Sequence, residues 1–106
     1  MFINLLIETR QVLEEYGKSF DDVIWIGNKC GYVTISKSDF LKYADVMYDN
    51  GYGLTNVNTD LIIVGDNWWL EREEYDGSEW WEFKTMPILV QEHVSMKNRL
   101  AERFII

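Results

Sequence analysis

The chain of 106 residues has the length of a single domain, and its composition separates it from several classes of protein. Apolar residues make up 47% of it, including five Trp, which is ample for a core and untypical of disorder. A single cysteine excludes an intramolecular disulfide, and the apolar runs are far shorter than the roughly 20 residues of a membrane span. We therefore predict one cytoplasmic domain over residues 1–106, with no signal peptide and no membrane contact.

The charge is acidic and unevenly placed. Ten Lys and Arg stand against 18 Asp and Glu, which gives a net charge of −8. Such a field repels nucleic-acid phosphates and anionic lipid, and it attracts basic proteins or cations. Eight of the acids lie between Asp60 and Glu82 with the single base Arg72, whereas residues 88–106 hold three bases and two acids. A need for solubility explains the net charge but not this asymmetry.

The first third of the chain predicts a helix followed by a hairpin. Residues 2–16 repeat apolar side chains at helical spacing, and Gly17 stands where a glycine commonly stops a helix. The β-rich runs at 23–26 and 32–35 flank a turn-like tetrad at 28–31, which predicts two paired strands.

A second helix is predicted between Ser36 and Asn50. Ser36 and Asp39 form an S-x-x-D start signal, an apolar helical face follows, and Asn50-Gly51 ends it. Residues 52–59 contain one Gly and two Asn, and we expect them to form a loop.

The remaining segment predicts three strands joined by tight turns. The strands are expected at residues 61–64, 68–75 and 78–85, with Gly65-Asp66 and Asp76-Gly77 as the turns. Residues 91–104 predict a further helix. The order α-β-β-α-β-β-β, with or without that C-terminal α, predicts an α+β fold in which helices pack on one face of a small, mostly antiparallel sheet.

A two-residue turn at Asp76-Gly77 fixes which residues of the last hairpin face each other. Paired residue numbers then sum to 153, so alternate side chains occupy opposite faces. The core face is expected to carry Trp68, Leu70, Arg72, Trp81 and Phe83, and the other face Trp69, Glu71, Glu73, Tyr75, Trp80, Glu82 and Lys84. Glu71 faces Glu82, and Glu74 faces Glu79, and like charges in such positions cost about 0.2–1 kcal/mol per pair.

These repulsions beside tryptophans indicate a surface for a basic partner, whose Lys and Arg would relieve them. The predicted partner-binding residues are Trp69, Glu71, Glu73, Tyr75, Asp76, Glu79, Trp80 and Glu82. The alternative is internal cover, in which a C-terminal helix brings Lys97, Arg99 and Arg103 onto the same acids. The protein itself is expected to be a monomer or a homodimer.

Motifs for catalysis are absent from the sequence. There is no G-x-S-x-G, no phosphate-binding GKS/T loop and no G-x-G-x-x-G, and a Cys–His pair would require Cys30 to meet His93. We expect no catalytic residues and no cofactor. A metal site built from Cys30, His93 and carboxylates is a remaining alternative, although no calcium-loop pattern is present.

Two segments resemble small acidic proteins encoded by phages and prophages of Gram-positive bacteria. Residues 64–84 match a VGD-x-WWLER-x-EYDGSEWWEFK hairpin, and residues 40–51 match a Phe-Leu-x-x-Ala-Asp-x-x-Tyr-Asp-x-Gly pattern. The resemblance covers residues 3–87, so that residues 88–106 form an extension to the family-like core. The group has no assigned biochemical function.

The resemblance implies a phage origin, and small acidic phage proteins often inhibit host machinery by occupying basic nucleic-acid channels. A CRISPR nuclease such as Cas9 holds its heteroduplex in such a channel. We therefore expect an anti-CRISPR-like inhibitor that binds a basic protein surface in the host cytoplasm. The alternative is a phage accessory or adaptor protein that self-associates or scaffolds through the same face.

Overall fold

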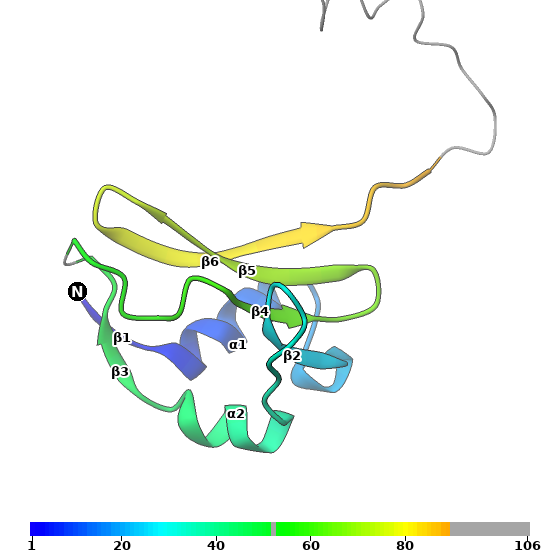
Figure 1. The fold of residues 1–106 in the computed structure, drawn as a ribbon, viewed down its shortest axis with the longest axis horizontal. Helices are drawn as coiled ribbons and strands as arrows, with labels where there is room; N and C mark the ends of the chain where they lie inside the picture. The colour runs from blue at the N-terminus through cyan, green and yellow to red at the C-terminus, as the bar shows by residue number, and fades with distance from the viewer. Residues whose placement is uncertain (52, 90–106) are drawn as a thin grey trace, which may run out of the picture.

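The computed structural model describes residues 1–51 and 53–89 and has an α+β fold (Figure 1). Its elements are β1 (Phe2–Asn4), α1 (Leu5–Glu15), the 3-10 helix η1 (Phe20–Asp22), β2 (Trp25–Asn28), α2 (Lys37–Tyr43), β3 (Met47–Asp49), β4 (Leu61–Val64), β5 (Trp68–Tyr75) and β6 (Ser78–Thr85). The helix predicted over 91–104 lies outside the described residues. None of the described helices is long and apolar enough to cross a membrane.

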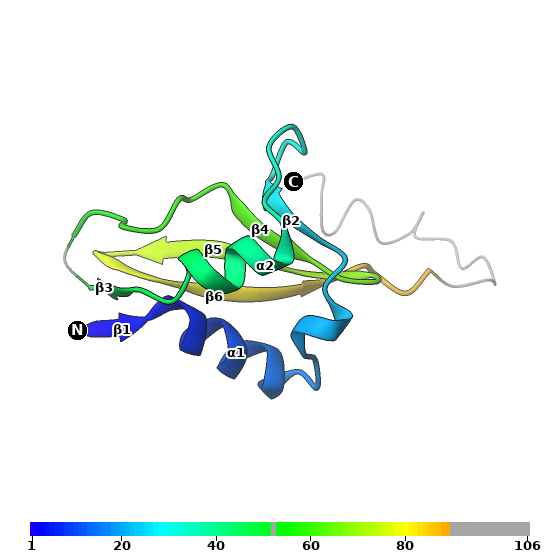
Figure 2. The same cartoon turned by 90° about the horizontal axis from the view of Figure 1, so that it is seen from below.

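Two antiparallel sheets organise the fold. The larger has the order β2-β4-β5-β6, and the smaller pairs β1 with β3. Helix α1 contacts β6 and α2 contacts β2, and both helices lie on the same side of the larger sheet (Figures 1 and 2). The predicted fold class is confirmed, with helices packed on one face.

The first helix is shorter than predicted because its first three expected residues form a strand. Asn4 caps α1, and its side-chain oxygen accepts a hydrogen bond from the Ile7 amide at 3.0 Å. Residues Phe2–Asn4 pair instead with β3, whose residues lie 43 to 47 positions further along the chain and which no local pattern predicts. The helix ends as expected, with Gly17 at a positive φ of 70°.

The second helix also ends earlier than predicted. The Ser36 side chain accepts from the Asp39 amide at 3.1 Å, which confirms the start signal. The helix stops at Tyr43, however, and Met47–Asp49 continue as β3. The amides of Leu5 and Leu6 bond to the carbonyls of Val46 and Ala44, so the start of α1 holds this segment extended.

The predicted hairpin of residues 23–26 and 32–35 forms with shifted bounds, because residues 26–28 pair antiparallel with residues 33–35. Strand β2 covers residues 25–28 and forms its ladder with β4 on one side. On its other side, the 33–35 segment contributes the bridge between Gly27 and Thr34 and two flanking backbone hydrogen bonds. Asn28 turns the chain here, because its side-chain oxygen accepts from the amides of Tyr32 and Val33, each at 3.1 Å. The long apolar ladder with β4 is the stronger pairing.

The turn between β4 and β5 lies one residue later than predicted. The Gly65 amide donates to the Trp68 carbonyl at 2.9 Å, so Asp66 and Asn67 are the turn residues, and Asn67 has a positive φ of 64°. Ile63 therefore pairs with Leu70, not with Trp68. The register moves by two residues, which leaves each side chain on its expected face.

The hairpin of β5 and β6 has the predicted strands and the predicted register. Leu70 pairs with Phe83, Arg72 with Trp81 and Glu71 with Glu82. Asp76 and Gly77 have φ values of 49° and 85°, as a two-residue turn with both residues in the left-handed region requires.

The core lies between the larger sheet and the helices. Its most buried apolar side chains are Leu13, Ile26, Ile63 and Leu70, each no more than 2% exposed. The predicted packing roles of Trp68 and Trp81 are confirmed, since both are buried, and Phe83 packs partly buried against the same cluster. The buried Trp81 donates its indole N–H to the Thr9 hydroxyl at 2.9 Å, and that hydroxyl donates to the Leu5 carbonyl at 2.7 Å.

We predict that Gly77→Ala lowers the free energy of unfolding by about 1–2 kcal/mol, because a side chain in the left-handed region is strained. Its Cβ would also lie 3.1 Å from the Gly53 backbone. Gly51→Ala is the matched control, since nothing lies within 4 Å of its Cβ position, and it should change the free energy by less than about 0.5 kcal/mol. Urea unfolding of the two variants measures the difference, and equal stabilities would contradict the turn geometry.

Candidate functional site

The hairpin of β5 and β6 presents a polar and aromatic surface on the side of the sheet away from the helices. We call this surface the outer face, and it consists of Trp69, Glu71, Glu73, Tyr75, Trp80, Glu82 and Lys84. Neither α1 nor α2 lies on it (Figure 1). The strict alternation of a strand places these side chains together, as the sequence predicted.

Both tryptophans of the outer face are fixed by carboxylates two residues further along the same strand. The Trp69 indole N–H donates to Glu71 at 3.3 Å, and the Trp80 N–H donates to Glu82 at 2.8 Å. Residues i and i+2 share one face of a strand, which makes these contacts local. The polar edge of each ring is thereby satisfied, and Trp80 keeps 37% of its surface exposed.

Glu71 is neutralised by lysines of its own chain. Its two carboxylate oxygens lie 3.3 Å from the Lys29 ammonium and 4.0 Å from the Lys84 ammonium. The expected facing of Glu71 and Glu82 is confirmed, but at Glu71 the neutralising charge comes from the chain's own Lys29 and Lys84 and not from a partner. The reason is tertiary, because Lys29 reaches Glu71 from the end of β2 across β4.

The acids nearest the turn have no such neighbours. No ion pair to Glu73, Glu74 or Asp76 occurs in the part of the chain that the structure describes. Tyr75, between them, is 77% exposed. We call Glu73, Glu74, Tyr75 and Asp76 the acidic tip. The uncompensated negative charge is concentrated there, at the turn end of the hairpin.

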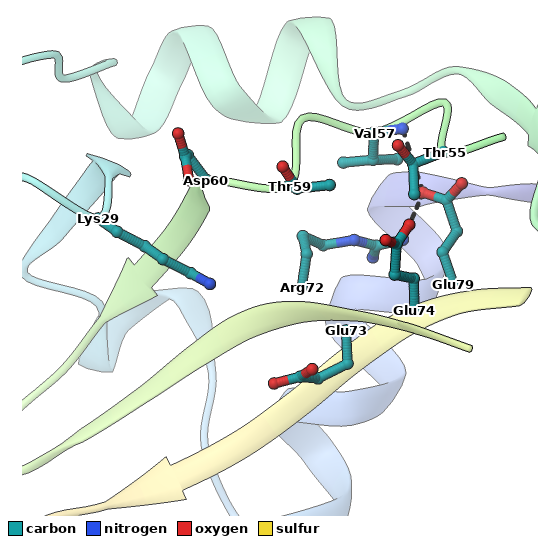
Figure 3. A pocket seen from close by; sticks show the side chains of 9 residues that line it. All are labelled: Lys29, Thr55, Val57, Thr59, Asp60, Arg72, Glu73, Glu74 and Glu79. Atoms are coloured by element: carbon teal, nitrogen blue, oxygen red, sulfur yellow. Dashed lines mark hydrogen bonds and ion pairs between the residues drawn. The ribbon is translucent and has the colours of Figure 1, made fainter.

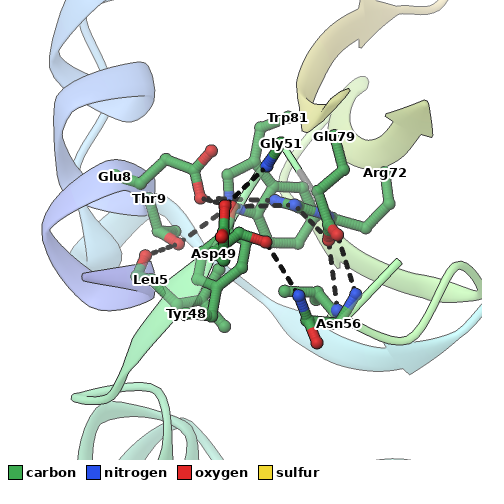
Figure 4. Close-up of polar contacts among 11 residues, drawn as sticks. Leu5, Glu8, Thr9, Tyr48, Asp49, Gly51, Asn56, Arg72, Glu79 and Trp81 are labelled. Carbon is green, nitrogen blue, oxygen red and sulfur yellow. Dashed lines mark hydrogen bonds and ion pairs between the residues drawn. The ribbon is translucent and has the colours of Figure 1, made fainter. Parts of the chain in front are cut away.

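Glu79 is not part of a partner surface, which corrects its sequence-based assignment. The residue is only 4% exposed and points to the helix side of the sheet. Its carboxylate accepts from Arg72 at 3.0 Å and from the amides of Asn56 and Val57 at 2.7 and 3.1 Å (Figure 4). A carboxylate with a charged partner and two amide donors is satisfied in the interior.

Arg72 is the centre of this buried group. Its guanidinium donates to Glu79, to the Tyr48 hydroxyl at 3.0 Å and to Glu8 at 3.4 Å, and the Tyr48 hydroxyl donates to Glu8 at 2.7 Å (Figure 4). The guanidinium carbon also lies 4.8 Å from the centre of the Trp81 ring. We call Glu8, Tyr48, Arg72 and Glu79 the buried arginine cluster. It joins α1, β3, β5 and β6, and through Glu79 it also holds the loop before β4.

The buried arginine cluster was not predicted, although the sequence carries one signal for it. Arg72 is the single base among eight acids and falls on the core side of the hairpin, opposite Trp81. A cation at a core position requires a buried carboxylate. Glu8 was not readable from the sequence because it is 64 residues from Arg72. Glu79 was readable, because the confirmed register puts it on the same face of the hairpin as Arg72.

A cavity of about 220 Å³ lies beside the part of β5 nearest its turn, beyond the residues that pair with β4 (Figure 3). Its ionisable lining residues are Lys29, Asp60, Arg72, Glu73, Glu74 and Glu79. Among residues 1–51 and 53–89, no group of three or more His, Cys, Asp or Glu is placed to hold a metal ion. Cys30 is exposed, and His93 lies outside those residues.

Comparison with known proteins adds no relative. No family model, no curated protein and no solved structure matches the chain.

We predict that Glu79→Gln lowers the free energy of unfolding by about 3 kcal/mol, because it leaves the buried Arg72 without its closest anion. Glu74→Gln, directly across the hairpin but exposed, is the matched control and should change it by less than about 0.5 kcal/mol. Chemical unfolding of both variants tests the assignment. A similar small loss from each would mean that the buried pair contributes little to stability.

We further predict that stability falls as the pH rises above 10. Burial, and next its hydrogen bond to Glu8, raise the pKa of Tyr48 well above its usual 10.0. The unfolded chain therefore loses the phenol proton first, and ionisation favours unfolding at alkaline pH. Tyr48→Phe should remove this part of the pH dependence, whereas Tyr32→Phe, at a 90% exposed position, should retain it. Thermal unfolding between pH 8 and pH 11 measures the slopes.

Proposed function

We propose that this protein is a binding protein whose acidic tip and adjoining outer face engage a basic protein surface. The observation that carries the proposal is the set of three acids without ion pairs among the described residues, next to the exposed rings of Tyr75 and Trp80. Acids that support the fold, such as Glu79, have partners within the chain. The tip acids have no ion pair within the described ranges, and they differ from other such acids, for example Glu14 and Glu15, in the exposed rings of Tyr75 and Trp80 beside them.

The chemistry of the tip suits a partner that presents lysine or arginine. Carboxylates steer a basic partner toward the hairpin and fix its orientation, and aromatic rings supply most of the contact energy. Trp80 pairs directly with Glu73 across the hairpin, so a ring and a carboxylate stand side by side at the centre of the proposed surface. An arginine side chain can stack on the first and pair with the second.

The residue set is narrower than the one expected from sequence. Glu79 is buried, and Glu71 is paired with two lysines, so neither offers a carboxylate to a partner. The retained residues are Glu73, Glu74, Tyr75, Asp76 and Trp80, with Trp69 and Glu82 at the border.

The partner class that we propose is a nucleic-acid-binding protein of bacterial defence, a CRISPR nuclease first of all. Two features support this choice. The chain resembles phage-encoded acidic proteins, and its net charge of −8 suits a site that normally holds nucleic acid. Such an inhibitor acts in the cytoplasm of the host cell, and it binds no nucleic acid itself because the phosphates repel it.

We expect Glu73→Lys/Glu74→Lys to weaken partner binding by at least about tenfold, since each reversal replaces attraction by repulsion at the contact. Glu14→Lys/Glu15→Lys changes the net charge equally at exposed positions of α1 and should bind as the native chain does. The measurement is inhibition of DNA cleavage by a purified, guide-loaded Cas9-type nuclease, with binding followed at low and high salt.

Equal inhibition by both double variants would contradict the tip as the contact surface. A native chain that neither binds nor inhibits the nuclease would contradict the proposed partner. Capture from a Gram-positive host lysate, with the tip variant as control, then separates a different basic partner from no partner at all.

A further inference from the structure

The two edge strands of the larger sheet differ in whether another segment covers them. The outer side of β2 is covered by residues 33–35, since the Ile35 amide donates to the Ile26 carbonyl and the Asn28 amide donates to the Val33 carbonyl, each at 3.0 Å. Natural sheets usually protect edges in this way, because an open edge is a template for another strand. The opposite edge, β6, has no such covering strand in residues 1–51 and 53–89.

Two hydrogen bonds show which amides of β6 face outward. The Met86 amide donates to the Asn67 carbonyl, toward β5, and the Glu79 amide donates to the Asn50 carbonyl, away from it. Because amides alternate along a strand, those of Trp81, Phe83 and Thr85 also point away from β5. Within the described ranges, none of these three amides has a hydrogen-bond acceptor. An open stretch of edge therefore runs from Trp81 to Thr85.

We propose that a second copy of this chain binds this edge, with the two β6 strands antiparallel and a two-fold axis beside Phe83. In that register the outward groups of Phe83 bond to those of its own counterpart, and the groups of Trp81 bond to those of Thr85. All outward donors and acceptors of the open stretch are then paired. The inference is argued from the strand edge and does not rest on the proposed function, although Trp80 and Glu82 belong to both surfaces.

Charge selects this register over its neighbours. With Phe83 on the axis, Glu82 lies directly opposite Lys84 of the second copy, and the symmetry makes the pair twice. A shift by one hydrogen-bonded step places Glu82 opposite Glu82 in one direction, or Lys84 opposite Lys84 in the other. Opposite charges stabilise facing positions and like charges destabilise them, so the neighbouring registers are disfavoured.

The two charged side chains have groups free for these contacts, whereas the Phe83 ring, beside the axis on the helix side, stacks on Tyr16 with ring centres 4.1 Å apart. Glu82 uses Oε2 for the Trp80 indole, and its Oε1 has no hydrogen bond within the described part of the chain. The Lys84 side chain is 40% exposed and its contact to Glu71 is long, at 4.0 Å. Trp80 and Met86, which are 37% and 55% exposed, come to face each other across the new interface and bury apolar surface.

The test compares the native chain with Glu82→Lys, Lys84→Glu and the double exchange by sedimentation at rising concentration. Each single variant sets like charges across the interface twice and should raise the dimer dissociation constant about tenfold. The double exchange restores opposite charges and should return it to near the native value. A structural defect cannot produce this rescue, and circular dichroism checks that each variant is folded.

A second measurement uses only the native chain, so it stands even if a variant fails to fold. The Phe83 amide should exchange with solvent more slowly as the concentration rises, whereas the Tyr32 amide, in the turn after β2, should not. Monomer at every concentration, or a Phe83 amide whose exchange is independent of concentration, would overturn the inference. A double exchange as weak as the single variants would overturn the proposed register.

Discussion

The guanidinium of Arg72 is the point at which the parts of this fold are joined. It lies in the interior with Glu79 and Glu8 at 3.0 and 3.4 Å and the Tyr48 hydroxyl between them, so that α1, β3, β5 and β6 share one polar contact. Glu79 also holds the loop before β4, because its carboxylate accepts hydrogen bonds from two backbone amides of that loop. A buried charge of this kind is tolerated only while its partners stay in place, which makes the arrangement of these elements specific.

The same cluster also decides which acids are available at the surface. It holds the Glu79 carboxylate in the interior, whereas Glu74, its neighbour across the hairpin, is exposed. Lys29 and Lys84 neutralise Glu71 in the middle of the sheet. What remains is a negative tip with an exposed tyrosine and a tryptophan beside it, at the end of the hairpin that is furthest from β2. The carboxylates of the hairpin that lack ion pairs are therefore gathered mainly at its turn end.

Local patterns succeeded where the deciding interactions are local. The Asp76-Gly77 turn places both strands of the last hairpin, and with them the face of every residue from Trp68 to Thr85. Ser36 marked its helix for the same reason. The predictions failed where a distant segment competes. Phe2–Asn4 and Met47–Asp49 were both assigned to helices, and each becomes a strand because the other is there to pair with it.

The sequence by itself determined the α+β class, the hairpin with its two faces, and the presence of tryptophans among carboxylates on one of them. Strand alternation and turn chemistry suffice for these, since they act over a few residues. Only the tertiary structure decided which carboxylates have partners within the molecule. The reason is that Glu8, Tyr48 and Lys29 contact the hairpin although each lies more than 20 residues away in the sequence. Charge pairing depends on distance in space, and no spacing along the chain encodes it.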